Sequence, residues 1–143
     1  MLLRSLVPAA LTALLGLAGC TLATDTGYPV EETCASGAPR VRTELFFGLD
    51  RFEEPPVTEA EWQEFVDAEV TSRFSEGLTM LSSDGQYLAE SGELIHEDSK
   101  IVILLHDGSP AASADIDAIR QAYIEQFDQE SVLRVDSDAC VGF

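Results

Sequence analysis

The chain has 143 residues and a formal net charge of −18, because 26 Asp and Glu residues outweigh eight Lys and Arg residues. So acidic a chain repels phosphate backbones, and no cluster of basic residues offsets the repulsion locally, so we expect no nucleic-acid partner. The length is enough for one domain with its own core and too short for two.

The N-terminal segment has the pattern of a bacterial export signal. Arg4 provides a positive start, residues 6–17 are apolar but too few for a permanent membrane span, and Leu17-Ala18-Gly19-Cys20 forms a small-residue cleavage site. The segment resembles a bacterial lipoprotein signal peptide, in which the cysteine carries a diacylglyceryl group and an acylated amino terminus. The alternative is an ordinary secretory signal that happens to end in cysteine.

This resemblance implies that residues 1–19 are removed and that Cys20 is the lipidation site. Several acyl chains on one residue hold a protein stably at a membrane, so we expect a lipid-anchored protein of the bacterial cell envelope, facing the periplasm or the cell surface. Thr21 follows the cysteine, instead of the Asp that marks inner-membrane retention in enteric bacteria. The outer membrane is therefore favoured over the inner one.

Two further cysteines, Cys34 and Cys140, remain in a chain bound for an oxidising compartment, and we expect them to form a disulfide bond. The rival interpretation, a catalytic or metal site, needs a CxxC pair or nearby ligands, and the sequence has neither. It also lacks a GxSxG elbow, a phosphate-binding glycine loop and a dinucleotide fingerprint. We therefore expect no metal and no cofactor.

The first half of the chain predicts a tether, a strand and a helix. Residues 20–40 are rich in Thr, Gly, Pro and acidic residues and predict a flexible tether, so the single domain is expected to span 41–143. Residues 41–48 alternate as a strand does. After Pro55-Pro56, Thr58 and Glu61 predict a capping box at the start of a helix over 59–74.

The second half predicts three strands and another helix. Residues 78–81 begin a strand, Asp84-Gly85 is a turn signal, and 86–99 form a polar excursion or a long hairpin. Residues 101–105 are apolar on both faces, which indicates a central strand. Ser109-Pro110 or Ser113 can cap a second helix, and 132–137 form a last strand just before Cys140.

The order β, α, β, β, α, β predicts an α+β fold of the ferredoxin-like type, a four-stranded antiparallel sheet with two helices on one face. In that topology the first and last strands are neighbours. The regions that contain Cys34 and Cys140 would then lie close together.

Residues 41–143 also resemble a family of small exported bacterial proteins known as domain of unknown function 3574. The resemblance covers the whole predicted domain but implies no reaction. It rests on Arg42-Thr43-Glu44-Leu45-Phe46-Phe47-Gly48, Arg73-Phe74, Gly77-Leu78-Thr79, Gly85-Gln86-Tyr87, Glu97-Asp98-Ser99-Lys100, Ile119-Arg120-Gln121-Ala122-Tyr123 and Gln129-Glu130-Ser131-Val132. Tyr87 departs from the Trp expected there.

The best candidate site is the sheet face that the helices leave open. Alternation places Arg42, Glu44 and Phe46 there, and a register that opposes Arg42 to Asp136 and Glu44 to Arg134 would form two cross-strand ion pairs. Such a set can hold a small polar ligand, or it can be an ordinary solvated ladder. Apolar residues of the central strand would also point to this face, where either a homodimer through the sheet or residues 86–99 could cover them, and self-association is the simpler explanation.

A second candidate lies before the central strand, where Glu97 and Lys100 could present a carboxylate and an ammonium to a small ligand, or could simply be a solvated turn. Three hypotheses follow. The chain is a binding or interaction module that uses the open face. Alternatively, it is a small acid–base enzyme with Glu44 or Glu97 as base and Arg42 orienting an anionic or polar substrate. In the third hypothesis, it is a structural partner in envelope assembly. The small-molecule ligand is not identified by any motif.

Overall fold

The computed structural model describes residues 34–51, 54–88 and 91–143. The predicted signal segment, Cys20 and the tether up to residue 33 lie outside these residues. Within the described part of the chain, no helix is long and apolar enough to cross a membrane.

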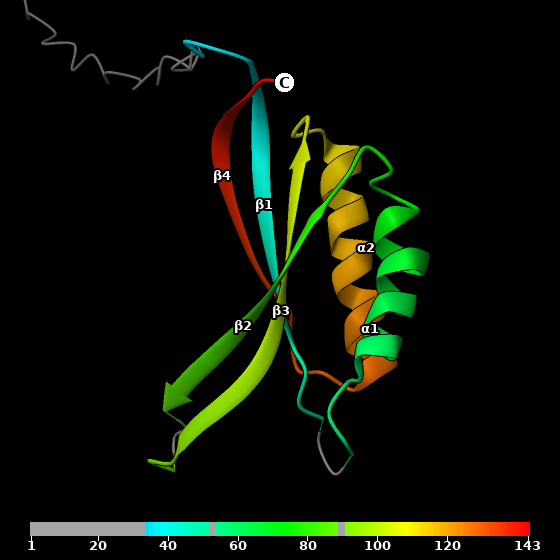
Figure 1. Cartoon of the computed structure of the whole chain (residues 1–143), viewed down its shortest axis with the longest axis vertical. Helices are drawn as coiled ribbons and strands as arrows, with labels where there is room; N and C mark the ends of the chain where they lie inside the picture. The colour runs from blue at the N-terminus through cyan, green and yellow to red at the C-terminus, as the bar shows by residue number, and fades with distance from the viewer. Residues whose placement is uncertain (1–33, 52–53, 89–90) are drawn as a thin grey trace, which may run out of the picture. The chain divides into compact units, whose positions relative to one another are not determined.

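Four strands form one antiparallel sheet in the order β2-β3-β1-β4. The strands are β1 (Ala38–Gly48), β2 (Thr79–Leu88), β3 (Leu94–His106) and β4 (Leu133–Val141). Both helices lie on the same side of the sheet (Figure 1). The predicted ferredoxin-like α+β fold is therefore confirmed, with the apolar strand β3 in a central position.

The first helix begins at the predicted capping box. Thr58 Oγ1 accepts a hydrogen bond from the Glu61 amide (3.3 Å), and the Glu61 carboxylate accepts one from the Thr58 amide (2.8 Å). The α-helix α1 (Glu59–Phe65) continues as a π-helical segment, η1 (Val66–Thr71), instead of remaining α-helical to Phe74. The wider turns of η1 still place Val66 and Val70 in the core.

The second helix, α2 (Pro110–Phe127), begins at Ser109, one of the two caps that the sequence predicts. The Ser109 hydroxyl accepts from the Ala112 amide at 3.2 Å, and Pro110 occupies the first turn, where a missing N–H costs little. The helix ends at Asp128, whose left-handed conformation (φ 52°) closes the last turn.

The turn predicted at Asp84-Gly85 is wrong, because both residues lie inside β2, opposite Asp98 and Glu97 of β3. The predicted long hairpin is formed instead, and Leu88 and Leu94 are the last pair of its ladder. The ladder continues through the polar stretch because Ser83 and Ser99 join their hydroxyls across the strands at 2.8 Å. Figure 1 shows this hairpin running away from the helices.

The core lies between the sheet and the helices and is centred on aromatic side chains. The Phe47 ring of β1 makes edge-to-face contacts with Trp62 (5.2 Å between ring centroids) and Tyr123 (4.8 Å). The Tyr123 hydroxyl donates to the carbonyl of Gly48 at 2.8 Å, so this buried polar group is satisfied. The remaining members of the aromatic group are Phe65 and Phe127.

The predicted disulfide bond between Cys34 and Cys140 is present, with the two Cα atoms 5.5 Å apart. It lies where the start of β1 meets the end of β4, since Ala38 pairs with Val141. The strand β1 accordingly begins at Ala38, earlier than the predicted start at Val41. The end of the predicted tether, residues 38–40, is therefore part of the sheet, because β4 is long enough to pair with it.

Candidate functional site

The sheet face opposite the helices, called here the open sheet face, carries Arg42, Glu44 and Phe46 as alternation predicts, because their neighbours Leu45 and Phe47 are fully buried in the core. Arg42 and Glu44 form an ion pair with 2.9 Å between Nε and Oε1. The pair lacks hydrogen-bond geometry, so the buried Nε has no hydrogen-bond partner in the described part of the chain.

Apolar side chains surround that ion pair on all four strands. Residues that pair across neighbouring strands lie on the same face of the sheet. The residues of β3 and β4 opposite Arg42, Glu44 and Phe46 therefore belong to the open sheet face, and so does Leu81 of β2, which is opposite Ile101. Among them Leu133 is 58% exposed, Leu105 43% and Val135 44%. The apolar members are Phe46, Leu81, Ile101, Ile103, Leu105, Leu133 and Val135.

Arg134 does not belong to the open sheet face, and the predicted cross-strand pairs do not form. In the observed register Arg42 is opposite Ser137 and Glu44 is opposite Val135, whereas Arg134 is opposite Leu45. Because side chains alternate along a strand, this difference of one residue moves Arg134 and Asp136 to the side of the helices.

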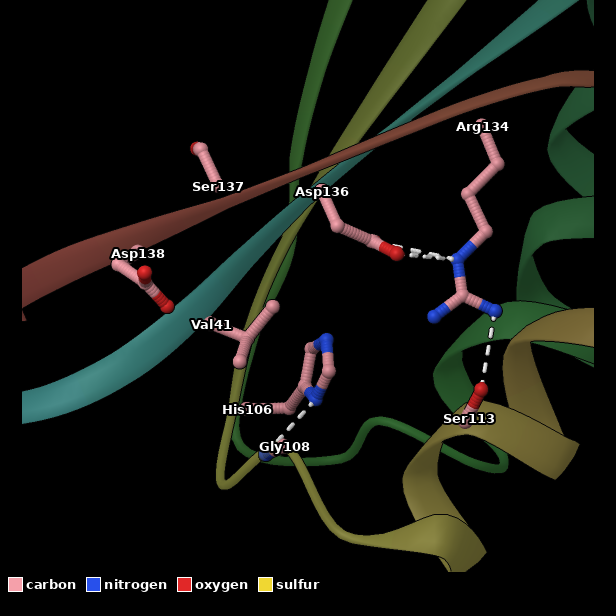
Figure 2. A pocket seen from close by; sticks show the side chains of 8 residues that line it. All are labelled: Val41, His106, Gly108, Ser113, Arg134, Asp136, Ser137 and Asp138. Atoms are coloured by element: carbon pink, nitrogen blue, oxygen red, sulfur yellow. Dashed lines mark hydrogen bonds and ion pairs between the residues drawn. The ribbon is translucent and has the colours of Figure 1, made fainter. Parts of the chain in front are cut away.

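On that side a cavity of about 310 Å³ lies between the end of β3, the first turns of α2 and the strands β1 and β4. We call it the β4–α2 cavity; Figure 2 shows its side chains. It is lined by Val41, His106, Gly108, Ser113, Arg134, Asp136, Ser137 and Asp138. It therefore joins Arg134 and Asp136, both predicted for the open sheet face, to residues that the sequence analysis did not select as a site.

A chain of hydrogen bonds crosses the floor of the cavity. The Gly108 amide donates to His106 Nδ1 (3.1 Å), so in the neutral ring the proton is on Nε2, which donates to Thr43 Oγ1 (2.8 Å). The Thr43 hydroxyl then donates to Asp136 Oδ1 (2.5 Å). Thr43 and His106 are both buried. Each of these polar groups thus has a hydrogen-bond partner, and the bond from Thr43 fixes the orientation of the Asp136 carboxylate.

Electrostatics keep His106 neutral and Asp136 ionised. Burial lowers the pKa of His106, and the nearby Asp136 carboxylate opposes this effect without overcoming it. Burial acts to raise the pKa of Asp136, but hydrogen bonds from Thr43 and Arg134 outweigh it, so the pKa of Asp136 is lowered. His106 cannot accept a proton on Nδ1 without losing the bond from Gly108. The arrangement therefore suits binding better than proton transfer.

These two lowered pKa values predict that the fold loses stability in acid. Each group has a lower pKa in the folded chain than in the unfolded chain, so at a pH between the two values the unfolded chain binds more protons. The free energy of unfolding therefore falls as the pH drops below about 6.5, where His106 of the unfolded chain becomes protonated, and falls again below about 3.8, where Asp136 of the unfolded chain does. Urea unfolding at a series of pH values measures this slope.

The control for this experiment is the exposed His96. His106→Gln should flatten the slope between pH 7 and pH 5 relative to the parent chain and to His96→Gln, the same substitution at an exposed position. An equal loss of slope in both variants would contradict the role given to His106.

The structure separates Glu97 from Lys100. Lys100 lies on the helix side, where Nζ donates to Glu59 (2.7 Å) and Ser82 (3.1 Å). Glu97 reaches back to Gly48, whose missing side chain leaves room for the carboxylate. Burial, followed by the charge of Asp50, raises the pKa of Glu97. This carboxylate lines a second hollow of about 330 Å³ with Asp50, Asp84, Gly85, His96 and Asp98.

Sequence reasoning missed Thr43, His106 and Asp136 as members of one network. Two signals were present: Thr43 is the polar residue among the otherwise apolar inward positions 41, 43, 45 and 47 of β1, and His106 ends the apolar run of β3. Both signals become informative only with the register, which brings β1, β3 and β4 together at this point.

The topology and the core define a single α+β domain of the ferredoxin-like class. The chain belongs to the family described as "Protein of unknown function (DUF3574)", whose model matches residues 42–143. This match confirms the family resemblance found in the sequence. No match was found among curated protein sequences.

Among solved structures, a phage SAM lyase in complex with S-methyl-5'-thioadenosine is 20% identical, with 74% of this chain and 85% of that chain covered and a TM-score of 0.56. The same phage enzyme in its apo state is 19% identical, with 70% and 81% covered and a TM-score of 0.53. CutA from Synechococcus elongatus is 15% identical, with 71% and 78% covered and a TM-score of 0.47. At these identities the likeness concerns the fold alone.

Proposed function

We propose that the chain is an interaction module of the bacterial cell envelope, held by lipid on Cys20, and that a second copy of the chain covers its open sheet face. The observation that carries the proposal is the band of exposed apolar side chains across all four strands, with Leu105, Leu133 and Val135 each more than 40% exposed. Contiguous exposed apolar surface of this kind is uncommon on soluble monomers and usually marks an interface.

The size of the face supports a second copy as the occupant. Four strands spaced by about 4.8 Å, with about ten residues each at about 3.3 Å, give a flat area on the order of 600 Å² before side-chain relief is added. A stable interface buries about 800 Å² of accessible surface on each partner. Covering this face once thus comes close to what a specific dimer needs.

The charges on the face are also compatible with self-association. Although the chain is strongly acidic, Arg42 and Glu44 balance one another at the centre of the face. A two-fold axis through the sheet could set Arg42 of each copy near Glu44 of the other, which would give the buried Nε a partner. The acidic remainder of the surface predicts that association strengthens as salt screens the repulsion.

Sedimentation velocity over a wide concentration range tests the proposal, using residues 21–143, which contain the whole compact unit 32–143. The parent chain should form a dimer. Leu133→Glu places a charge in the proposed interface and should weaken dimerisation by more than about tenfold. Met80→Glu is the matched control, because Met80 is a similarly exposed apolar residue whose partner, Val102, faces the helix side.

Two results would overturn the proposal: a parent chain that stays monomeric, or a Leu133→Glu variant that dimerises as the parent does. A monomeric chain whose open face crosslinks a different envelope protein would instead favour the structural-partner hypothesis. The proposed anchor is tested separately, by labelling the full chain with palmitate and comparing Cys20→Ala.

The acid–base hypothesis has weaker support. Glu97 has the raised pKa that a base needs, but it lies beside Gly48, and Arg42 is six residues away along β1, about 20 Å at 3.3 Å per residue. Arg42 therefore cannot orient a small substrate at Glu97. Glu44, the other candidate base, is paired with Arg42.

A further inference from the structure

The β4–α2 cavity has an arginine that is fixed in place and still has an unused donor. Arg134 Nε donates to both oxygens of Asp136 (3.1 and 3.0 Å), and Nη1 donates to Ser113 (3.1 Å) and Asp117 (3.3 Å). Its Nη2 has no partner among the described residues. Figure 2 shows the unbonded nitrogen on the side of the guanidinium that faces His106. Its N–H groups are available to a molecule in the cavity.

The cavity also has carboxylates in excess of its positive charge. Asp136 balances Arg134, Asp117 is shared between Arg134 and Arg120, and His106 is neutral because its pKa is lowered by burial. Asp138, on the same wall, has no hydrogen-bond or ion-pair partner among the described residues. The local charge is therefore negative, which disfavours anions and favours a cationic group next to Asp138.

Hydrogen bonds fix the orientation of the Asp136 carboxylate before a cationic group binds. Thr43 donates to one oxygen from beneath, and Arg134 contacts both oxygens from the side, so the carboxylate cannot rotate freely. A carboxylate accepts about four hydrogen bonds, so these contacts leave an acceptor position on Oδ2 for a molecule in the cavity. Fixing the acceptor before binding reduces the entropy that a ligand must pay.

We propose that the β4–α2 cavity binds a small organic ammonium compound that also has neutral oxygen acceptors, with the ammonium at Asp138 and Asp136 and an oxygen at Arg134 Nη2. The volume of about 310 Å³ corresponds to about ten water molecules at about 30 Å³ each, which suits a molecule the size of an amino sugar. The cavity lies on the helix side of the sheet, so this site is independent of the open sheet face.

Three sugars of equal size and different charge test this assignment: glucosamine, glucose and glucuronate, titrated into residues 21–143 by calorimetry. Glucosamine should bind saturably, glucose at least about tenfold more weakly, and glucuronate least of all. Asp138→Asn should weaken glucosamine binding by about tenfold or more. This exposed residue has no structural partner in the described part of the chain, so the variant is expected to fold.

The matched control is Glu64→Gln, which removes one negative charge from an exposed position on α1, outside the cavity. Unchanged glucosamine binding in this variant would show that the effect at Asp138 is local and is not general attraction to an acidic chain. The Leu133→Glu variant should bind glucosamine as the parent chain does, because Leu133 lies on the open sheet face. Failure of the dimer proposal can therefore be told apart from failure of the cavity proposal. The assignment is overturned if glucosamine does not bind saturably, if glucuronate binds as well, or if Asp138→Asn has no effect.

Discussion

Replacing Cys34 and Cys140 together with serine is expected to lower the free energy of unfolding by about 2–5 kcal/mol. The bond closes a loop of 106 residues, nearly the whole domain, so its removal restores a large amount of freedom to the unfolded chain. It also frees the first residues of β1, which pair with β4 alone. Urea unfolding of the double variant and of the parent chain measures the difference.

The parent chain under a reducing agent provides the control for this prediction. It should unfold at the same urea concentration as the double serine variant, because both lack the same covalent constraint. A double variant whose stability lies within about 0.5 kcal/mol of the oxidised parent would show that the bond contributes little, as happens for surface substitutions without a structural role.

The second large effect is expected at the centre of the aromatic core. Phe47→Ala removes a fully buried ring that contacts Trp62, Phe65 and Tyr123, and it should cost about 3–5 kcal/mol, from lost burial and from the space left behind. Urea unfolding measures the loss for a chain that still folds. If the variant does not fold, Phe47→Leu keeps most of the volume and should cost less, which preserves the test.

Phe46→Ala is the matched control, since the two phenylalanines are adjacent on β1 and point to opposite faces. In a monomer, Phe46→Ala should cost far less than Phe47→Ala, because Phe46 is only partly buried on the open sheet face. In a dimer formed through that face, its effect should increase with protein concentration. Equal costs for both variants at low concentration would contradict the assignment of the two faces.

Local signals in the sequence predicted most of the fold. Thr58 and Glu61 mark a helix start because their side chains can satisfy the free amides of the first turn, and that requirement does not depend on the rest of the structure. Ser109 acts in the same way. The apolar run in β3 indicated a central strand because a strand covered on both faces needs apolar residues at every position.

The candidate site was harder to predict, because it depends on the register between strands. In β4, apolar and charged residues alternate from Leu133 to Asp136. Whichever set faces the helices, the strand has one apolar and one charged face, so its sequence alone does not decide the orientation. The apolar residues took the open sheet face, and the charged ones took the helix side, where Ser113 and Asp117 of α2 accept from Arg134. Nothing local to β4 contains that information, since the deciding partners are on another element.

The disulfide bond between the first and last strands also decides how the domain would respond to tension. A pull on the segment before Cys34 enters the fold at that residue and passes through the covalent link into Cys140, so β1 and β4 take the load together. The hydrogen bonds between these two strands are then not peeled apart one after another. A protein attached at its amino terminus could thereby transmit force to a bound partner with its sheet intact.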